Sequence, residues 1–175
     1  MPATISVTED GLFVALWTFI VDLLGVDGQK VLRTQQNRAP MTKGDFVYMT
    51  PIRLDGLSYT RTDYAPSLDQ RIDVRKNKWH VQLDFYGSSA YEWASTFAII
   101  LRSAKATAML DGTPLSPLYV DDPWQGAIIN SETQWEQRWT LDVHFQVDMA
   151  VTTDQQFADE LIIETVAAES LNEGA

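Results

Sequence analysis

Two long segments in which apolar and polar residues alternate constrain the fold of this chain more than any other feature. In residues 71–86 the apolar positions are Trp79, Val81, Leu83 and Phe85. In residues 135–149 they are Trp139, Leu141, Val143, Phe145, Val147 and Met149. A period of two places successive side chains on opposite faces of a strand. Both segments are therefore predicted to be long β-strands, each with one face in the core and one polar face.

Two amphipathic helices are also predicted. The first begins after Thr8, an N-cap residue, and ends at Gly25, which suits a C-terminal cap. Its buried stripe is Leu12, Phe13, Leu16, Trp17, Ile20 and Leu24. The second begins after Ser88 or Ser89 and runs to about residue 106. Its stripe is Ala90, Trp93, Ala94, Phe97, Ile100, Leu101 and Ala104.

The remaining segments complete an α+β prediction. Residues 45–54 read as a strand in which Pro51 indicates an edge or a bulge, and residues 161–166 as a last strand. Residues 26–44 and 55–70 are predicted to be long loops, and 167–175 a flexible C-terminus. The chain, 1–175, is expected to form a single domain. Its mainly antiparallel sheet should carry two helices on its apolar face and long loops at its rim.

Composition excludes several classes of protein. The chain of 175 residues has no cysteine, which excludes disulfides, thiol catalysis and thiolate metal sites. Its longest apolar run, residues 12–24, contains Thr18 and Asp22 and is too short to span a bilayer. We expect a soluble protein that folds in a reducing cytoplasm and has no membrane partner.

Charge is distributed unevenly along the chain. The net charge of −11 argues against ordinary nucleic-acid binding, which requires clustered cations. Residues 111–175 contain 13 acidic side chains and one basic side chain, Arg138, whereas residues 1–110 are close to neutral. The acidic end and the basic middle of the chain are compatible with head-to-tail pairing between copies. The alternative is a solvated acidic end without a partner.

The polar faces of the two long strands carry the residue types of a possible site. If the strands are neighbours, His80, Gln82 and Asp84 lie close to Asp142, His144 and Gln146. Two histidines and two aspartates suit a metal ion, or a general base with its orienting carboxylate. The alternative, which the alternating pattern favours, is the ordinary solvated face of an antiparallel pair.

Other catalytic motifs are absent from the sequence. It contains no glycine-rich phosphate loop, no nucleophile elbow and no paired histidines at helical spacing. Asp121 and Asp122 lack the further spaced acids of a calcium loop. Arg138 stands among acids, which favours an ion pair within or between subunits. We therefore expect no catalytic residue, no metal and no cofactor.

Four motifs, in order, resemble the phage neck (tail terminator) family. The first is the strand end LDFYG at residues 83–87, with Ala90 three residues on. The others are PLYVDDPWQ at residues 117–125, NSETQWEQRW at residues 130–139 and QQFADEL at residues 155–161. The chain departs from the family pattern at Val120, Trp124 and Ser131. The family has an arginine at the position of Trp124.

The resemblance implies a structural virion protein at the neck, assembled in the host cytoplasm. It implies a sixfold ring that caps the tail tube and meets a neck, head-completion or connector protein, while genomic DNA passes through without specific binding. Interface candidates are Lys30, Arg33, Arg38, Lys43, Arg75, Lys76, Lys78, Tyr119, Asp121, Asp122, Trp124 and Arg138. Channel-lining candidates are Asp84, Asp142 and Asp148.

Two other hypotheses remain open. In the first, the protein is a head-completion adaptor that stays on the connector. In the second, it is a small metal-dependent enzyme that uses His80, Asp84, Asp142 and His144. Replacing both histidines separates the enzyme from the structural roles, because a ring should still assemble without them.

Overall fold

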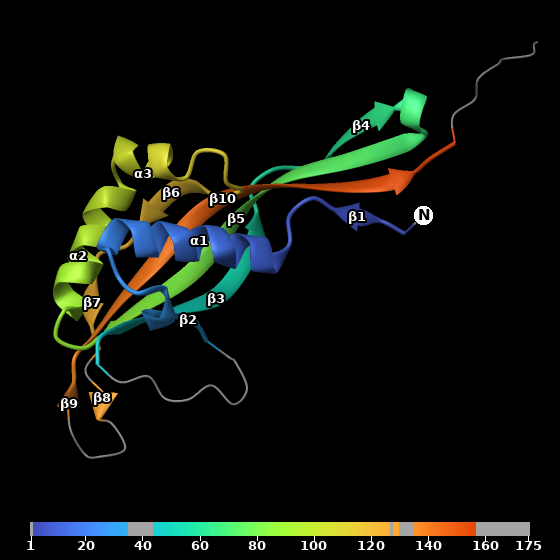
Figure 1. Cartoon of the computed structure of the whole chain (residues 1–175). Coiled ribbons are helices and arrows are strands. Elements are labelled where there is room, and N and C mark those ends of the chain that lie inside the picture. Colours follow the sequence, from blue (N-terminus) through green and yellow to red (C-terminus); the bar gives the residue numbers. More distant parts are fainter. Residues whose placement is uncertain (1, 35–43, 127, 130–134, 157–175) are drawn as a thin grey trace, which may run out of the picture.

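The fold is built on one antiparallel pair of very long strands. The computed structural model describes residues 2–34, 44–126, 128–129 and 135–156. Strands β5 (Gln70–Tyr86) and β10 (Arg138–Asp154) are 17 residues each and pair over their whole length. Both strands predicted from the alternation are confirmed. Each is longer than its apolar segment, and their far ends project beyond the helices (Figure 1).

Shorter strands complete the sheet on both sides of this pair. The order is β1–β10–β5–β3–β2, with β6 and β7 also paired to β10 and β4 paired to β5. The bounds are β1 Thr4–Ile5, β2 Val31–Arg33, β3 Phe46–Gly56, β4 Arg61–Ala65, β6 Ser116–Val120 and β7 Trp124–Gln125. A separate pair is formed by β8 Ile128–Ile129 and β9 Trp135–Glu136. The register of β3 against β5 shifts between Pro51 and Arg53, which confirms the predicted bulge.

Three helices cover one face of the broad end of the sheet. They are α1 (Glu9–Leu24), α2 (Ala90–Leu101) and α3 (Ala104–Met109), and they enclose the core against the sheet (Figure 1). Thr8 accepts a hydrogen bond from the Gly11 backbone N–H, and Gly25 ends α1 in the left-handed conformation, as predicted. Phe19 of α1 meets Phe97 of α2 edge to face, with centroids 5.5 Å apart.

The second predicted helix is in fact two. It breaks at Ser103, whose backbone is extended and whose hydroxyl accepts from the Lys105 N–H, so that it acts as the N-cap of α3. As a consequence Ala104, expected in the buried stripe, is exposed, while Ala106 is buried. The reason is that a serine hydroxyl competes with the helical backbone for hydrogen bonds.

The prediction that residues 55–70 form a loop is also wrong. These residues extend β3 to Gly56 and add β4 and the short 3-10 helix η2 (Pro66–Leu68). With the far halves of β5 and β10 and with β1, they form the arm, the part of the sheet that no helix covers in Figure 1. In the predicted loop at 26–44, residues 28–33 form the 3-10 helix η1 (Gly28–Lys30) and β2. The predicted strand at 161–166 and the flexible tail at 167–175 lie outside the described residues.

The turn between β5 and α2 depends on Gly87. Its φ is +94°, and a Cβ at this position would overlap the side chain of Asp45. Asp45 accepts from the Ser88 N–H at 2.7 Å and from the Ser89 hydroxyl at 2.8 Å. Burial acts to raise the pKa of Asp45, but these hydrogen bonds outweigh it and lower the pKa. Asp45 thus connects the start of β3 to the start of α2.

We expect Gly87→Ala to lower the free energy of unfolding by about 3 kcal/mol, since it combines a strained φ with a steric overlap. Gly112→Ala is the matched control. Gly112 also has a positive φ, +74°, but nothing lies within 4 Å of the position that a Cβ would occupy there. Gly112→Ala should lower the free energy of unfolding by only about 1 kcal/mol. Urea denaturation measures both losses, and equal losses would contradict the role of Asp45.

Candidate interaction face of the sheet

The candidate site is the polar face, defined here as the side of β3, β5, β10, β6 and β7 that points away from the helices. Alternate residues of β5 lie on this face, each opposite a residue of β10 on the same face. His80 is opposite His144, Gln82 is opposite Asp142, and Asp84 is opposite Thr140. The prediction that these two polar rows are neighbours is confirmed.

Asp84 is the buried charge of the polar face. It is 5% exposed, and its Oδ1 accepts from Arg138 Nε at 3.0 Å, from Arg138 Nη2 at 2.8 Å and from the Thr140 hydroxyl at 2.6 Å. A buried carboxylate is tolerated when it is paired and hydrogen-bonded in this way. The ion pair expected of Arg138 therefore forms within the chain. Asp84 was wrongly predicted to line a channel, because it is buried.

A row of three stacked rings crosses the polar face. His144 stacks on Tyr119 of β6, with centroids 4.1 Å apart, and on His80 of β5, with centroids 4.3 Å apart. His80 Nε2 lies 2.9 Å from Asp142 Oδ1, and because a carboxylate only accepts, this nitrogen carries the proton. Burial lowers the pKa of His144, and the charges of His80 and Lys78 lower it further against the opposing effect of Asp121 and Asp142.

These contacts bear on the metal and general-base hypotheses. Within the described ranges, no three His, Cys, Asp or Glu side chains form a group that fits a metal ion. Asp84 is held by Arg138, and Asp142 is held by His80. The carboxylates of Asp84 and Asp142 are therefore already paired with other side chains, and the face presents ordinary cross-strand pairs.

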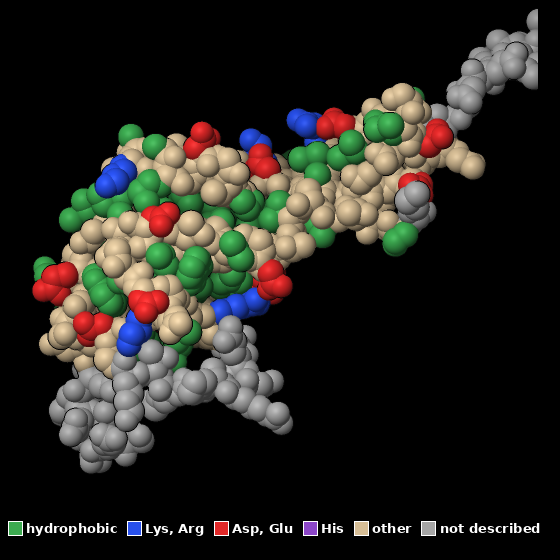
Figure 2. Space-filling view, viewed as in Figure 1, with side chains coloured by type: hydrophobic (Ala, Val, Ile, Leu, Met, Phe, Trp, Pro, Cys, Tyr) green, Lys and Arg blue, Asp and Glu red, His purple; other side chains and the backbone are tan. Residues whose placement is uncertain are grey.

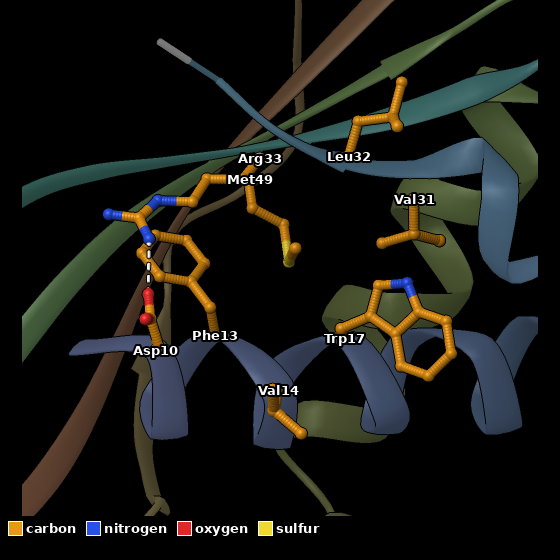
Figure 3. A pocket seen from close by; sticks show the side chains of 8 residues that line it. All are labelled: Asp10, Phe13, Val14, Trp17, Val31, Leu32, Arg33 and Met49. Carbon is orange, nitrogen blue, oxygen red and sulfur yellow. Dashed lines mark hydrogen bonds and ion pairs between the residues drawn. The ribbon is translucent and has the colours of Figure 1, made fainter. Parts of the chain in front are cut away.

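The basic side chains near β2 that were predicted to contact a partner already bond within the chain where they are described. Arg33 bonds to Glu9 at 2.8 Å and to Asp10 at 3.0 Å, and its guanidinium lies 4.2 Å from the centroid of the Phe13 ring. It borders an apolar groove of about 390 Å³ between α1 and β2, where its bond to Asp10 is visible (Figure 3). Lys30 is half-buried and also has a partner. Arg38 and Lys43 lie outside the described residues.

The other predicted cations lie on the arm or at its base. Arg75 and Lys76 are exposed, and Arg75 Nε donates to the carbonyl of Ser58. The side chain of Lys78 is only 19% exposed, because it lies between the Tyr119 hydroxyl at 3.4 Å and Asp55 at 3.6 Å. Lys78 is thus part of the polar face rather than a free contact residue.

The predicted acidic and aromatic contacts gather at the β6–β7 edge of the sheet. Tyr119 and Trp124 are 45% and 49% exposed, and Asp121 and Asp122 are exposed. Arg102, which the sequence did not single out, donates to the Val120 carbonyl at 2.7 Å and to Asp122 at 2.9 Å. No local pattern signals this contact, because it joins the end of α2 to the segment after β6. On the side that carries α1, acidic and basic side chains are scattered among apolar ones (Figure 2).

The fold is that of an α+β protein, with helices on one side of the sheet and a polar face on the other. Residues 10–169 match the family model of the phage neck terminator protein, and the chain belongs to this family. The family is structural and its members are virion proteins of the neck, as the sequence motifs predicted. Comparison with curated proteins gave no match. Over the described part of the chain, no helix has the length and apolarity needed to cross a membrane.

We expect Arg138→Met to lower the free energy of unfolding by about 3 kcal/mol, because it leaves the buried carboxylate of Asp84 without its partner. The double variant Asp84→Asn/Arg138→Met should recover part of the loss. The control is Arg61→Met, which breaks the exposed pair Arg61–Asp63 and should cost at most about 1 kcal/mol. Urea is the appropriate denaturant, since guanidinium chloride would screen the charges. Similar losses for the two arginine variants would contradict this account of the network.

Proposed function

We propose that the protein forms a homo-oligomeric ring, with six copies, that caps the tail tube and joins it to the neck or the head connector. Membership of the neck terminator family supports this role. Its partners are further copies of the chain, the tail tube protein, and a head-completion or connector protein. We infer a role without catalysis, because the family is structural and the polar face holds cross-strand pairs.

The observation that carries the proposal is the pair of free edges on opposite sides of one sheet. In the described residues, β2 pairs only with β3, while β6 and β7 pair only with β10. A protein with two different contact edges can associate head to tail, and such contacts close into a ring when the rotation permits. The acidic side chains Asp121 and Asp122 lie beside the second edge.

The polar face is our candidate for the wall of the channel through which the genome passes. It carries Asp142, which is held by His80, and Asp148, which is exposed and accepts from the Gln146 amide at 2.8 Å. Negative groups on this wall repel phosphates and oppose specific binding of DNA. With Asp84 buried against Arg138, the wall is less acidic than the sequence alone indicated.

The role is tested by inactivating the gene in its phage and imaging the lysate by negative-stain electron microscopy. We expect overlong tubes beside DNA-filled heads without tails, because a tube without its terminator continues to grow. Tails of normal length that fail to attach would instead make the protein a head-completion adaptor. Intact virions would contradict both structural roles.

The contact edge is tested by supplying variants to the same phage. Asp121→Lys/Trp124→Ala changes an exposed charge and an exposed aromatic side chain at the β6–β7 edge. We expect at least about a tenfold loss of complementation, since interface aromatics and charges contribute on the order of 1–2 kcal/mol each. Asp111→Lys/Ile99→Ala makes a comparable change on the helix layer, where Ile99 is 69% exposed, and should complement normally. Equal complementation by the two variants would exclude the β6–β7 edge as a contact.

A further inference from the structure

The three stacked rings of the polar face are two histidines, of which His144 is buried and His80 half-buried, and a tyrosine that covers them. His144 is 5% exposed, and it lies between His80 and Tyr119 at ordinary stacking distances. Nδ1 of His80 and Nδ1 of His144 are both buried and have no hydrogen-bond partner. A neutral imidazole tolerates one such nitrogen as an unused acceptor, whereas an imidazolium must donate from both nitrogens. The arrangement thus suits the neutral form of His144.

The charged groups around His144 come from every strand packed against it. They are His80 and Lys78 on β5, Asp142 on β10, Asp121 after β6, and Arg53 on β3, which lies opposite His80. Arg53 and Lys78 both bond to Asp55, and Asp142 is already bonded to His80. A proton on His144 would therefore add a positive charge near Lys78, while the carboxylates of Asp55 and Asp142 are already bonded to other side chains.

Strand β6 is the element that can give way. It has five residues, pairs only with β10 among the described strands, and its register shifts between His144 and Phe145, next to the stack. Pro117 has no N–H to contribute to the ladder. Leu115 and Val120 are almost fully buried and hold the two ends of the strand, whereas Leu118 and Tyr119 are 41% and 45% exposed. Moving the Tyr119 ring aside would open His144 to water without disturbing those ends.

We propose that the stack of Tyr119, His144 and His80 is an acid-sensitive latch, which holds the middle of β6 on the sheet when His144 is neutral and releases it when His144 takes up a proton. The direction follows from the closed state. Because the pKa of His144 is lowered there, the closed state binds the proton less readily than an open state with an ordinary histidine. The closed state is favoured above the ordinary histidine pKa and loses stability as the pH falls below it. Each unit of difference in pKa changes the ratio of open to closed molecules by up to about tenfold.

The test is hydrogen exchange of the full chain at about pH 7.5 and about pH 5, on either side of the ordinary histidine pKa of roughly 6.5. With exchange corrected for its intrinsic pH dependence, the peptide that contains Leu118 and Tyr119 should lose protection at the lower pH. Peptides from the centre of β5 should not change, because that strand is paired on both sides. Equal protection of the β6 peptide at both pH values would overturn the latch.

Two variants separate the latch from general acid sensitivity. His144→Gln cannot be protonated and should show no pH response in β6, whereas His80→Gln retains the titrating residue and should still respond. A response that persists in His144→Gln would contradict the proposal. Should that variant fail to fold, NMR of the unaltered protein decides the question. The His144 ring and the Tyr119 amide must then titrate with one midpoint, and different midpoints would contradict it. Sedimentation velocity at both pH values is run alongside, because a change of assembly without a histidine-dependent change in exchange would also count against it.

Discussion

The pairing of β5 with β10 is the constraint on which the rest of the structure depends. Its continuous register over 17 residues places Trp79, Leu83 and Phe85 on the same side as the apolar residues of β10, where the helices cover them. A slip of one residue would turn every apolar side chain to the polar face. Apolar and polar residues must therefore alternate strictly where the helices cover β5 and β10. On the arm, which no helix covers, this alternation is not required.

The same register also determines the chemistry of the polar face. It places Thr140 opposite Asp84, where the hydroxyl donates to the carboxylate, and His144 opposite His80, where the two rings stack. Asp84 is buried without an unpaired charge, and the histidines stack rather than converge on a ligand. The residues that drew attention as a possible metal site are thus used within the sheet, in keeping with the structural role of the family.

The structural features that could be predicted from the sequence are those set by residues close together in the chain. Alternation predicted β5 and β10, and the capping residues predicted α1, because periodicity and capping act over a few residues. Helix α2 begins after Ser89 as predicted, but the Ser89 side chain does not cap it and donates to Asp45 instead. Strands β1 and β4 of the arm were missed, since a sheet layer that no helix covers has no apolar face to bury and reads as a polar loop. Trp17 was expected in the core but is 36% exposed, because its indole N–H donates to the Gly28 carbonyl at the rim. The stack of Tyr119 on His144 and the Arg102–Asp122 pair were missed because they join segments far apart in the chain.

The part of the sheet that forms the hydrophobic core is distinct from the parts that are exposed. The core lies between the helices and the broad end of the sheet, and the buried side chains there, such as Leu16, Phe97 and Phe145, are inaccessible to a partner. The strand edges, the polar face and the arm lie outside this core. The arm is held by its strand pairing and by contacts between strands, such as the hydrogen bond from the Thr62 hydroxyl of β4 to Asp73 of β5, rather than by a second layer. Because these surfaces share β10 and β5 with the core, a contact at an edge or on the arm acts directly on the two strands that hold the molecule together.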